Sequence, residues 1–251
     1  MRLIRTTSEE PELASFPEEE IPDYAILSHV WEEEEVSFQH MQDSSGPPSI
    51  NLKNKKGWSK IVRACKVARS DSWDYIWIDT CCIDKSSSAE LSEAINSMYR
   101  YYRKAAVCYV YLADLRSDLP GRSFSFSFRR CKWFTRGWTL QELIAPKTVV
   151  FFAKDWEKFG TKASLQGILT EITRIPSEVL VSQVDPSESS IAARMSWAAG
   201  RRTTRIEDRA YSLMGIFGVY MPPIYGEGEH AFIRLQEEIL KVSDDHTLFA
   251  W

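Results

Sequence analysis

The order of apolar segments along this chain constrains its fold more than any other feature of the sequence. Four short apolar runs predict buried strands, and segments with helical spacing of apolar residues lie between them. The predicted strands cover residues 24–28, 75–78, 106–112 and 149–153, and the predicted helices cover residues 58–68, 91–102 and 138–144. Strands that are apolar throughout and alternate with helices are typical of a parallel sheet covered on both faces. We therefore predict an α/β fold with a mostly parallel sheet flanked by helices.

The pattern changes to helices alone after residue 160. Helical faces are predicted at residues 165–172, 206–217 and 232–239, and surface loops at residues 46–48, 116–128 and 176–190. Serines at 86–88 can cap the second helix of the first half, and Thr204 with Glu207 fits a capping box. We predict a single domain over residues 1–251, with an α/β core at 1–160 and a helical C-terminal extension at 161–251.

Size, composition and cysteine spacing narrow the class of protein. The chain has 251 residues, of which 44% are hydrophobic, and this is long enough to bury a large core. The sequence contains no apolar run of the roughly 18 residues that a membrane span needs, and its start lacks the apolar stretch of a secretory signal. Five cysteines without CxxC spacing are interpreted as buried free thiols of a reducing compartment, not as a disulfide frame or a zinc site. We expect a cytoplasmic protein with no membrane span.

Charge is distributed unevenly along the chain. The net charge of −4 gives no general attraction to nucleic acid, so no nucleic-acid partner is expected. Acidic residues dominate between residues 9 and 35, whereas arginines cluster at 129–136 and 201–209. Such clusters are either solvated surfaces or a basic rim that attracts an anionic ligand, and the sequence leaves both interpretations open.

One carboxylate, Glu142, lies in the middle of a short apolar and aromatic helix, where burial is costly without a partner. Trp138 is four residues away and shares its helix face, and Arg136 comes just before the helix. Such a set can bind a sugar phosphate, because the carboxylate accepts hydroxyl hydrogen bonds, the indole stacks and the guanidinium pairs with phosphate. The alternative is a surface glutamate, or one locked to Arg136.

Polar side chains also follow the first two predicted strands. Ser28 and His29 end the first strand and Asp79 ends the second, and parallel sheets bind ligands beyond the carboxyl ends of their strands. His29 is either a base or a structural residue, and Asp79 either binds a hydroxyl group or caps the next turn. Cys81 or Cys82 beside these residues is either a nucleophile or a buried thiol. No P-loop, dinucleotide fingerprint or metal-ligand spacing occurs, so no metal site is predicted.

Five ordered segments of the chain resemble the heterokaryon-incompatibility (HET) domain of fungi. They are YAILSHVW at 24–31, WIDTCCID at 77–84, RGWTLQEL at 136–143, RIEDRAY at 205–211 and MPPIYGEGE at 221–229. One departure is Glu32, which stands where the family often has glycine and leaves less room for a ligand to approach the backbone. The resemblance implies a cell-death effector domain of fungal non-self recognition, which often forms the N-terminal part of larger receptors with further domains.

HET domains in turn look distantly like Toll/interleukin-receptor (TIR) domains, which implies a TIR/flavodoxin-like sheet. The TIR pattern places its catalytic glutamate in a Trp-Cys-Leu-x-Glu-Leu helix, and residues 138–143 have the same W-x-L-x-E-L spacing. This resemblance implies that Glu142 is catalytic and that NAD+ is cleaved at the nicotinamide–ribose bond, with NAD+ as substrate and no other cofactor. The TIR pattern maps a role onto Glu142 alone. The residues at the strand ends and around Glu142 complete the hypothesis: Ser28, His29 and Asp79 line the pocket, Trp138 or Trp31 stacks, and Arg136 contacts phosphate.

Three functional hypotheses follow from the sequence. The first is a TIR-like NAD+-cleaving effector that requires self-association, because TIR-like sites are often completed by a neighbouring protomer. The second is a non-enzymatic signalling module that triggers cell death through protein–protein contacts. The third is a hydrolase whose nucleophile is Cys81 or Cys82.

Overall fold

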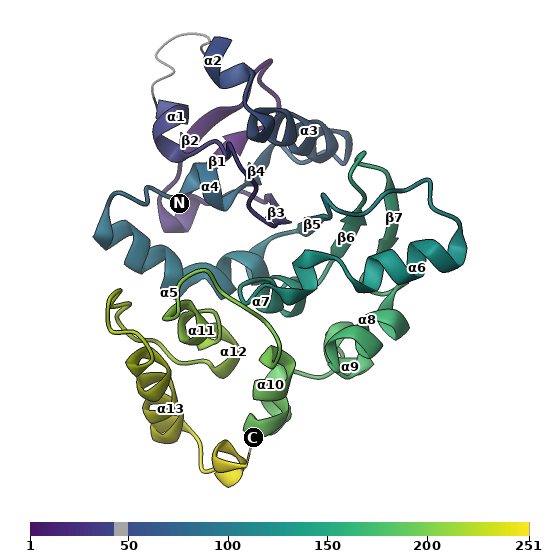
Figure 1. The fold of residues 1–251 in the computed structure, drawn as a ribbon. Coiled ribbons are helices and arrows are strands. Elements are labelled where there is room, and N and C mark those ends of the chain that lie inside the picture. Colours follow the sequence, from purple (N-terminus) through teal and green to yellow (C-terminus); the bar gives the residue numbers. More distant parts are fainter. Residues whose placement is uncertain (43–49, 251) are drawn as a thin grey trace.

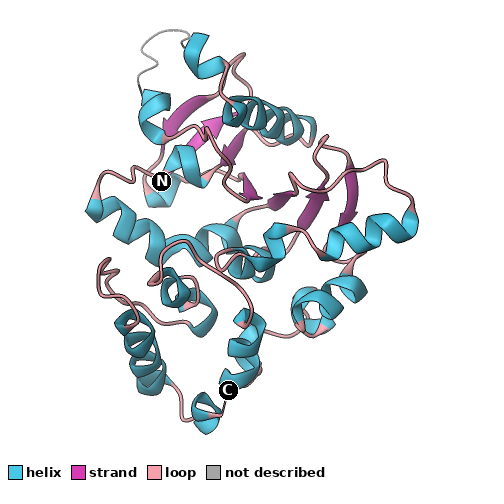
Figure 2. Ribbon diagram, viewed as in Figure 1, coloured by secondary structure: helices cyan, strands magenta, loops and turns pink. Residues whose placement is uncertain are grey.

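The computed structural model describes residues 1–42 and 50–250, and within them seven strands form one sheet (Figure 1). The strand order is β2-β1-β4-β3-β5-β6-β7, and helices lie on both sides of the sheet (Figure 2). The strands are β1 (Arg2–Arg5), β2 (Glu12–Ser15), β3 (Ala25–His29), β4 (Tyr75–Trp77), β5 (Val107–Tyr111), β6 (Val149–Phe152) and β7 (Lys158–Thr161). The loop predicted at residues 46–48 lies outside the described residues.

The four central strands, β4, β3, β5 and β6, are parallel, which confirms the predicted α/β fold with a mostly parallel sheet. The chain runs from β3 to β4 on one side and then returns across β3 to reach β5 on the other. This is the flavodoxin-like order, in which the connections diverge between the carboxyl ends of β3 and β5. A ligand crevice is expected at that switch point, directly beyond Ser28 and His29.

Three further strands, β1, β2 and β7, join the edges of the sheet in antiparallel pairs that the sequence pattern does not predict. Each has only four residues, and β2 and β7 contain no fully buried residue. Strands this short and this exposed show no clear apolar period, so the sequence pattern does not predict them.

The helices between the central strands divide between the two faces of the sheet. Figure 1 shows α3 (Lys56–Ser70) on one face, with α5 (Ser88–Lys104) and α7 (Thr139–Ile144) on the other. The predicted serine cap of α5 is confirmed, because Glu90 N donates to Ser87 Oγ at 3.4 Å. The shorter helices of this half are η1 (Glu18–Glu20), α1 (Phe38–Gln42), α2 (Ile50–Lys53), α4 (Asp79–Cys82), α6 (Gly121–Arg129) and η2 (Lys132–Thr135).

The chain beyond β7 is helical, as predicted. Its helices are α8 (Gln166–Thr173), α9 (Ser177–Leu180), η3 (Pro186–Glu188), α10 (Ile191–Ala198), α11 (Asp208–Tyr211), α12 (Met214–Phe217), α13 (His230–Val242) and η4 (His246–Phe249). α12 packs on α5 so closely that a Cβ at Gly215 would lie 2.1 Å from the Tyr99 Cβ. Among the described residues, no helix combines the length and the apolar character that a membrane crossing requires.

Two segments predicted as loops contain helices. Residues 116–128 include most of α6, where Phe124 and Phe128 are four residues apart and both pack edge-on against Phe159. The alternation of serine and phenylalanine in this segment therefore conceals a helical period. Residues 176–190 include α9, which directly follows Pro176, and η3, which starts at Pro186; proline at the first helical position favours a helix start.

Two predictions for the segment from residue 204 to residue 217 are wrong. The predicted helix over 206–217 is divided into α11 and α12, because the chain turns near Leu213 to place Gly215 against α5. The predicted capping box is absent, since the Glu207 carboxylate instead accepts hydrogen bonds from Gly226 N at 2.8 Å and Gly228 N at 3.2 Å. This carboxylate joins two segments of the C-terminal part.

We expect Gly215→Ala to destabilise the protein, because the added methyl group forces α12 away from Tyr99 on α5. Overpacking of this kind costs about 1–3 kcal/mol, measurable as a lower midpoint in urea unfolding. Gly167→Ala in α8 is the matched control, because nothing lies within 4 Å of its added Cβ and alanine favours helices. Equal stability of the two variants would contradict the close contact between α12 and α5.

Candidate active site

The helix that carries Glu142 is held at both ends by side-chain hydrogen bonds. At its start, Thr139 Oγ1 donates to the carbonyl groups of Trp133 (2.5 Å) and Arg136 (2.9 Å). At its end, the buried ammonium of Lys162 donates to the carbonyls of Leu143 and Pro146. A cation at a helix C-terminus satisfies carbonyl groups that lack partners within the helix. All six residues of α7 are buried, so Glu142 has little freedom to move.

A chain of hydrogen bonds fixes the Glu142 carboxyl group. Trp133 Nε1 donates to Ser28 Oγ at 2.7 Å, and Ser28 Oγ donates to Glu142 Oε2 at 2.5 Å. The indole N–H can only donate, so the serine oxygen must accept from it and its own proton is directed to Glu142. Glu142 is 8% exposed, and Ser28 and Trp133 are almost fully buried. This series of hydrogen bonds holds Oε2 of Glu142 in place at the wall of a cleft.

The surroundings of Glu142 favour its neutral form. Burial raises the pKa of Glu142 to about 8, and the charge of Asp79 acts in the same direction. Hydrogen bonds from Ser28 and Tyr102 and the charge of Arg201 oppose this rise without cancelling it. The described residues contain no ion pair to Glu142. A strongly shifted carboxyl group at the edge of a cleft is a marker of functional sites.

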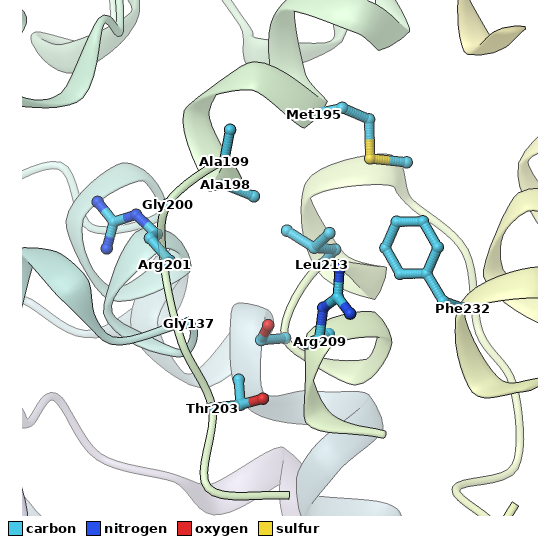
Figure 3. A pocket seen from close by; sticks show the side chains of 11 residues that line it. Gly137, Met195, Ala198, Ala199, Gly200, Arg201, Thr203, Arg209, Leu213 and Phe232 are labelled. Atoms are coloured by element: carbon cyan, nitrogen blue, oxygen red, sulfur yellow. The ribbon is translucent and has the colours of Figure 1, made fainter. Parts of the chain in front are cut away.

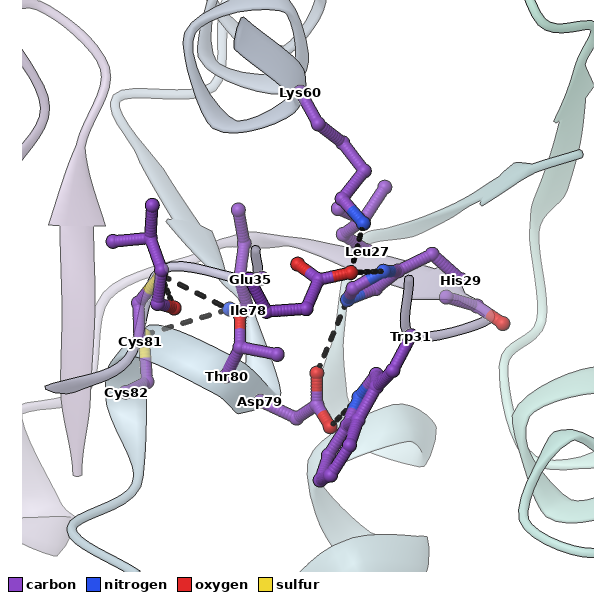
Figure 4. Close-up of polar contacts among 12 residues, drawn as sticks. Leu27, His29, Trp31, Glu35, Lys60, Ile78, Asp79, Thr80, Cys81 and Cys82 are labelled. Carbon is purple, nitrogen blue, oxygen red and sulfur yellow. Dashed lines mark hydrogen bonds and ion pairs between the residues drawn. The ribbon is translucent and has the colours of Figure 1, made fainter. Parts of the chain in front are cut away.

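A second network at the carboxyl ends of β3 and β4 centres on Asp79 (Figure 4). His29 Nε2 lies 3.2 Å from Asp79 Oδ1, and Trp31 Nε1 donates to Asp79 Oδ2 at 2.8 Å. Burial alone would raise the pKa of Asp79, but Lys85, His29 and Trp31 together lower it to about 2. The Lys85 ammonium also lies 3.6 Å from the centre of the Trp31 ring. Asp79 is therefore ionised and orients two side chains.

The Asp79 network is anchored on its far side by an ion pair. Glu35 Oε1 accepts from Lys60 Nζ at 2.5 Å and lies 3.8 Å from His29 Nδ1. Figure 4 shows Glu35 and Asp79 on opposite sides of the His29 ring. Asp79 orients the ring through Nε2, whereas Nδ1 is buried without a hydrogen-bond partner among the described residues, and His29 forms a fixed wall of the site.

These residues surround one cleft with a volume of about 280 Å³. Six of the seven residues predicted for the site line this cleft: His29, Trp31, Asp79, Arg136, Trp138 and Glu142. Ser28 does not line it but supports Glu142 from behind. The structure thus brings all seven predicted residues into one place, although they come from three separate segments of the sequence.

The C-terminal part of the chain supplies one wall of the cleft. Thr204, Arg205, Asp208 and Tyr225 all line it. The Arg205 guanidinium lies 4.1 Å from the centre of the Tyr225 ring, and Tyr225 donates to Asp208 Oδ1 at 3.0 Å. Arg136 Nη2 donates to Thr204 Oγ1 at 3.0 Å and so joins the core to this wall. The sequence analysis did not assign these four residues to the site.

The alternative interpretations of Glu142, a surface glutamate or one locked to Arg136, are both wrong. The side chain is buried, and Arg136 hydrogen-bonds to Thr204 instead. The arginine whose charge acts on it is Arg201, which donates to Arg136 O at 3.0 Å and to Thr139 Oγ1 at 2.9 Å. Burial lowers the pKa of Arg201 to about 10. Arg201 and Trp133 are contributors to the site that the sequence analysis missed, because no spacing rule connects them to Glu142.

All five cysteines are free and buried, which confirms their interpretation as thiols of the core. Burial raises the pKa of Cys81 well above its usual range, and it raises that of Cys82 to about 12. Cys81 Sγ faces the carbonyl of Val36, and Cys82 Sγ accepts from Ile78 N (Figure 4). Neither thiol provides the thiolate that a nucleophile requires, which argues against the cysteine-hydrolase hypothesis.

A second, smaller cavity of about 100 Å³ lies between α10, α11 and α13. Figure 3 shows Met195, Leu213 and Phe232 around it, with Arg209 at one side. None of the residues predicted for the site lines this cavity. This small cavity therefore holds none of the candidate chemistry. A further cavity of about 570 Å³ opens beyond the carboxyl ends of β3 and β5 and shares Trp31 with the cleft.

Comparison with known proteins identifies the class of domain. A model of the family described as Heterokaryon incompatibility protein (HET) matches residues 24–125. Over 232 residues the chain is 49% identical to Vegetative incompatibility protein HET-E-1 of Podospora anserina, a match that covers 90% of this chain. The chain carries a HET domain. This chain spans 17% of the length of that relative. No solved structure matches the HET domain significantly, and its likeness to TIR domains stays a prediction.

We expect Glu142→Gln to stabilise the HET domain at pH 9 and to change its stability little at pH 5. The folded-state pKa of Glu142, about 8, lies above its ordinary value of 4.5. The folded protein therefore holds this proton more tightly, and its stability falls as the pH rises from 4.5 through 8. Glutamine carries no charge to bury. The melting temperature of the Glu142→Gln variant should therefore exceed that of the unmodified protein by roughly 5–10 °C at pH 9.

Glu207→Gln is the control for this measurement, because Glu207 is an equally buried glutamate whose pKa shifts the other way. Backbone hydrogen bonds, including those from Gly226 and Gly228, lower the pKa of Glu207. The Glu207 carboxylate therefore stabilises the folded protein at neutral pH, and this contribution is lost in acid. Glu207→Gln should destabilise the protein at pH 7. A constant effect of Glu142→Gln between pH 5 and pH 9 would contradict the raised pKa of Glu142.

Native HET domain treated with iodoacetamide at pH 8 should remain unlabelled at all five cysteines for many minutes. The thiols are buried and protonated, so each reacts only after local opening of the structure. Mass spectrometry should detect five additions once the protein is unfolded in urea. Rapid native labelling of Cys81 or Cys82 would restore the cysteine-hydrolase hypothesis.

Proposed function

We propose that this HET domain is a cell-death effector of fungal vegetative incompatibility and that it cleaves NAD+ at the nicotinamide–ribose bond. The incompatibility role is supported by the match to HET-E-1, whose name states that role. The enzymatic role is supported chiefly by one observation. Glu142 is a buried carboxyl group with a raised pKa, and it faces a cleft that also contains Trp31, Trp138 and Tyr102.

The chemistry requires little apparatus beyond one carboxylate. When the bond between the ribose C1′ and the nicotinamide N1 breaks, both bonding electrons move to N1, and nicotinamide leaves as a neutral molecule. No general acid is needed, and positive charge develops on the ribose ring. A fixed carboxylate stabilises such an oxocarbenium-like transition state, as in glycosidases. Water then adds to C1′ and releases a proton, so that ADP-ribose is formed.

In the proposed reaction, substrate binding changes the ionisation of Glu142. The free carboxyl group is mostly protonated at pH 7, since its pKa is about 8. A pyridinium cation in the cleft favours the carboxylate and drives the proton off. The ionised Asp79 adds further negative potential, because its carboxylate lines the same cleft. The neutral resting state would limit activity until a cationic substrate binds.

The aromatic side chains of the proposed pocket differ in their freedom to stack. Lys85 covers one face of the Trp31 indole, so a nicotinamide can stack on that face only after the lysine moves. Trp138 is half-buried at the wall of the cleft and packs against the core. We therefore assign the stacking role to Trp138 first. Self-association and further receptor domains remain part of the proposal, since this chain spans 17% of HET-E-1.

We expect concentrated HET domain, clustered on a multivalent scaffold, to release nicotinamide from NAD+, and Glu142→Gln to reduce the rate at least 100-fold. The value of kcat/KM should rise tenfold per pH unit below about pH 8 and level off above it, because the free enzyme must lose the Glu142 proton. Product formation is followed by chromatography. Glu171→Gln, which changes an exposed glutamate in α8, should leave the rate unchanged.

Two results would exclude the enzymatic part of the proposal. One is intact NAD+ after clustering at high concentration, and the other is equal cleavage by Glu142→Gln and the unmodified protein. In either case the alternative is a non-enzymatic signalling module. That alternative predicts that Glu142→Gln retains its toxicity in cells, whereas the enzymatic proposal predicts that toxicity disappears together with NAD+ cleavage.

A further inference from the structure

The most buried and the most exposed charged groups of the cleft differ in sign, while Lys85 and Asp208 also line it. The carboxyl groups of Glu142 and Asp79 lie at its inner end, where Glu142 is 8% exposed and Asp79 is half-buried. The exposed Arg205 lies nearer the solvent, and Arg136 is half-buried, as Asp79 is. A ligand that matches this order carries its positive charge at the end that enters first and its negative charge behind.

The two arginines of the cleft form no direct ion pair within the described residues, although the charge of Arg205 acts on the carboxyl groups of Glu207 and Asp208. Arg209 pairs with Glu229 and Arg129 pairs with Glu171, whereas no ion pair within the described residues involves Arg136 or Arg205. Both are nevertheless held in place by neutral groups. Arg136 donates to Thr204, and Arg205 lies over the ring of Tyr225. Guanidinium groups that are oriented without a direct ion pair are suited to bidentate contacts with phosphate.

The size of the cleft limits how much of a ligand it can enclose. Its volume of about 280 Å³ lies just below the roughly 300–1,000 Å³ typical of small-molecule sites. This is room for a nicotinamide ribose unit but not for a whole dinucleotide. The remainder of a dinucleotide would extend beyond the cleft, and Arg136 and Arg205 are the arginines of its lining that it could contact.

From these three observations we infer that Arg205, together with Arg136 and Thr204, forms a diphosphate-binding site that orients a dinucleotide with its cationic end inward. The inference rests on the proposed function and extends it, because it assigns substrate recognition to the C-terminal part of the chain. Arg205 belongs to that part and Arg136 to the α/β part. A bound diphosphate would bridge the two parts and hold the cleft in the form that positions the ribose against Glu142.

The test compares three substrates that share the cleaved bond and differ in phosphate content. They are NAD+ with two phosphates, nicotinamide mononucleotide with one and nicotinamide riboside with none. Arg205→Gln should lower kcat/KM for NAD+ by roughly 10- to 100-fold, because charge-assisted hydrogen bonds to the phosphates are lost. The same substitution should leave kcat/KM for nicotinamide riboside within about twofold of the value for the unmodified protein. Arg136→Gln should likewise lower kcat/KM for NAD+ more than kcat/KM for nicotinamide riboside.

Arg202→Gln is the matched control, because Arg202 is exposed in the same segment and does not line the cleft. It should change none of the three rates. An equal loss for all three substrates with Arg205→Gln would overturn the inference, because it would show a structural effect in place of phosphate recognition. An unchanged rate with NAD+ would overturn it as well.

Binding measurements separate this inference from the proposed reaction. If the unmodified protein cleaves none of the three substrates, the enzymatic proposal fails, and ADP-ribose and ribose are then compared as ligands by calorimetry. The diphosphate site predicts that ADP-ribose binds, that ribose binds at least tenfold more weakly, and that Arg205→Gln removes this preference. Equal binding of ADP-ribose by Arg205→Gln and Arg202→Gln would reject the site whatever the outcome for catalysis.

Discussion

The hydrogen bond from Ser28 to Glu142 is the interaction on which the candidate site depends. It joins the end of β3 to α7 across 114 positions of sequence, and it buries a carboxyl group where no ion pair compensates it. Because Trp133 donates to the same hydroxyl, the direction of the bond is fixed. Removing the serine would leave a buried acid without its main polar partner, which is costly for stability. The cost of this arrangement is consistent with a functional role for Glu142.

The C-terminal helical part completes the cleft and does not merely support the sheet. It packs on α5 through Gly215, brings Arg201 within electrostatic range of Glu142 and places Arg205, Asp208 and Tyr225 at the wall. The two parts therefore share one polar site. A change in how they pack would alter the opening of the cleft and the pKa of Glu142 together, which connects the packing of helices far from the sheet to the chemistry at its edge.

Sequence analysis predicted the site better than its energetics. The residues at the ends of β3 and β4 were located correctly because apolar strands end where polar residues begin, and parallel strands bring those ends together. The segment around Glu142 was located by its W-x-L-x-E-L spacing. Trp133, Arg201 and Arg205 were not assigned to the site. Trp133 reaches Glu142 only through Ser28 on β3, and the two arginines approach it only when α7 and the segment after α10 pack together. The helix α6 was missed because Phe124 and Phe128 find their partners on β7 and β6.

The sequence by itself determined the α/β class, the parallel core of the sheet and the HET family, since these follow from local apolar periods and ordered motifs. Only the tertiary structure decided that Glu142 is buried, which group holds it and which charges surround it. Local patterns report which residues are next to each other along a helix or strand. The ionisation of a carboxyl group depends on desolvation and on charges from all sides, and these come from segments that folding alone brings together.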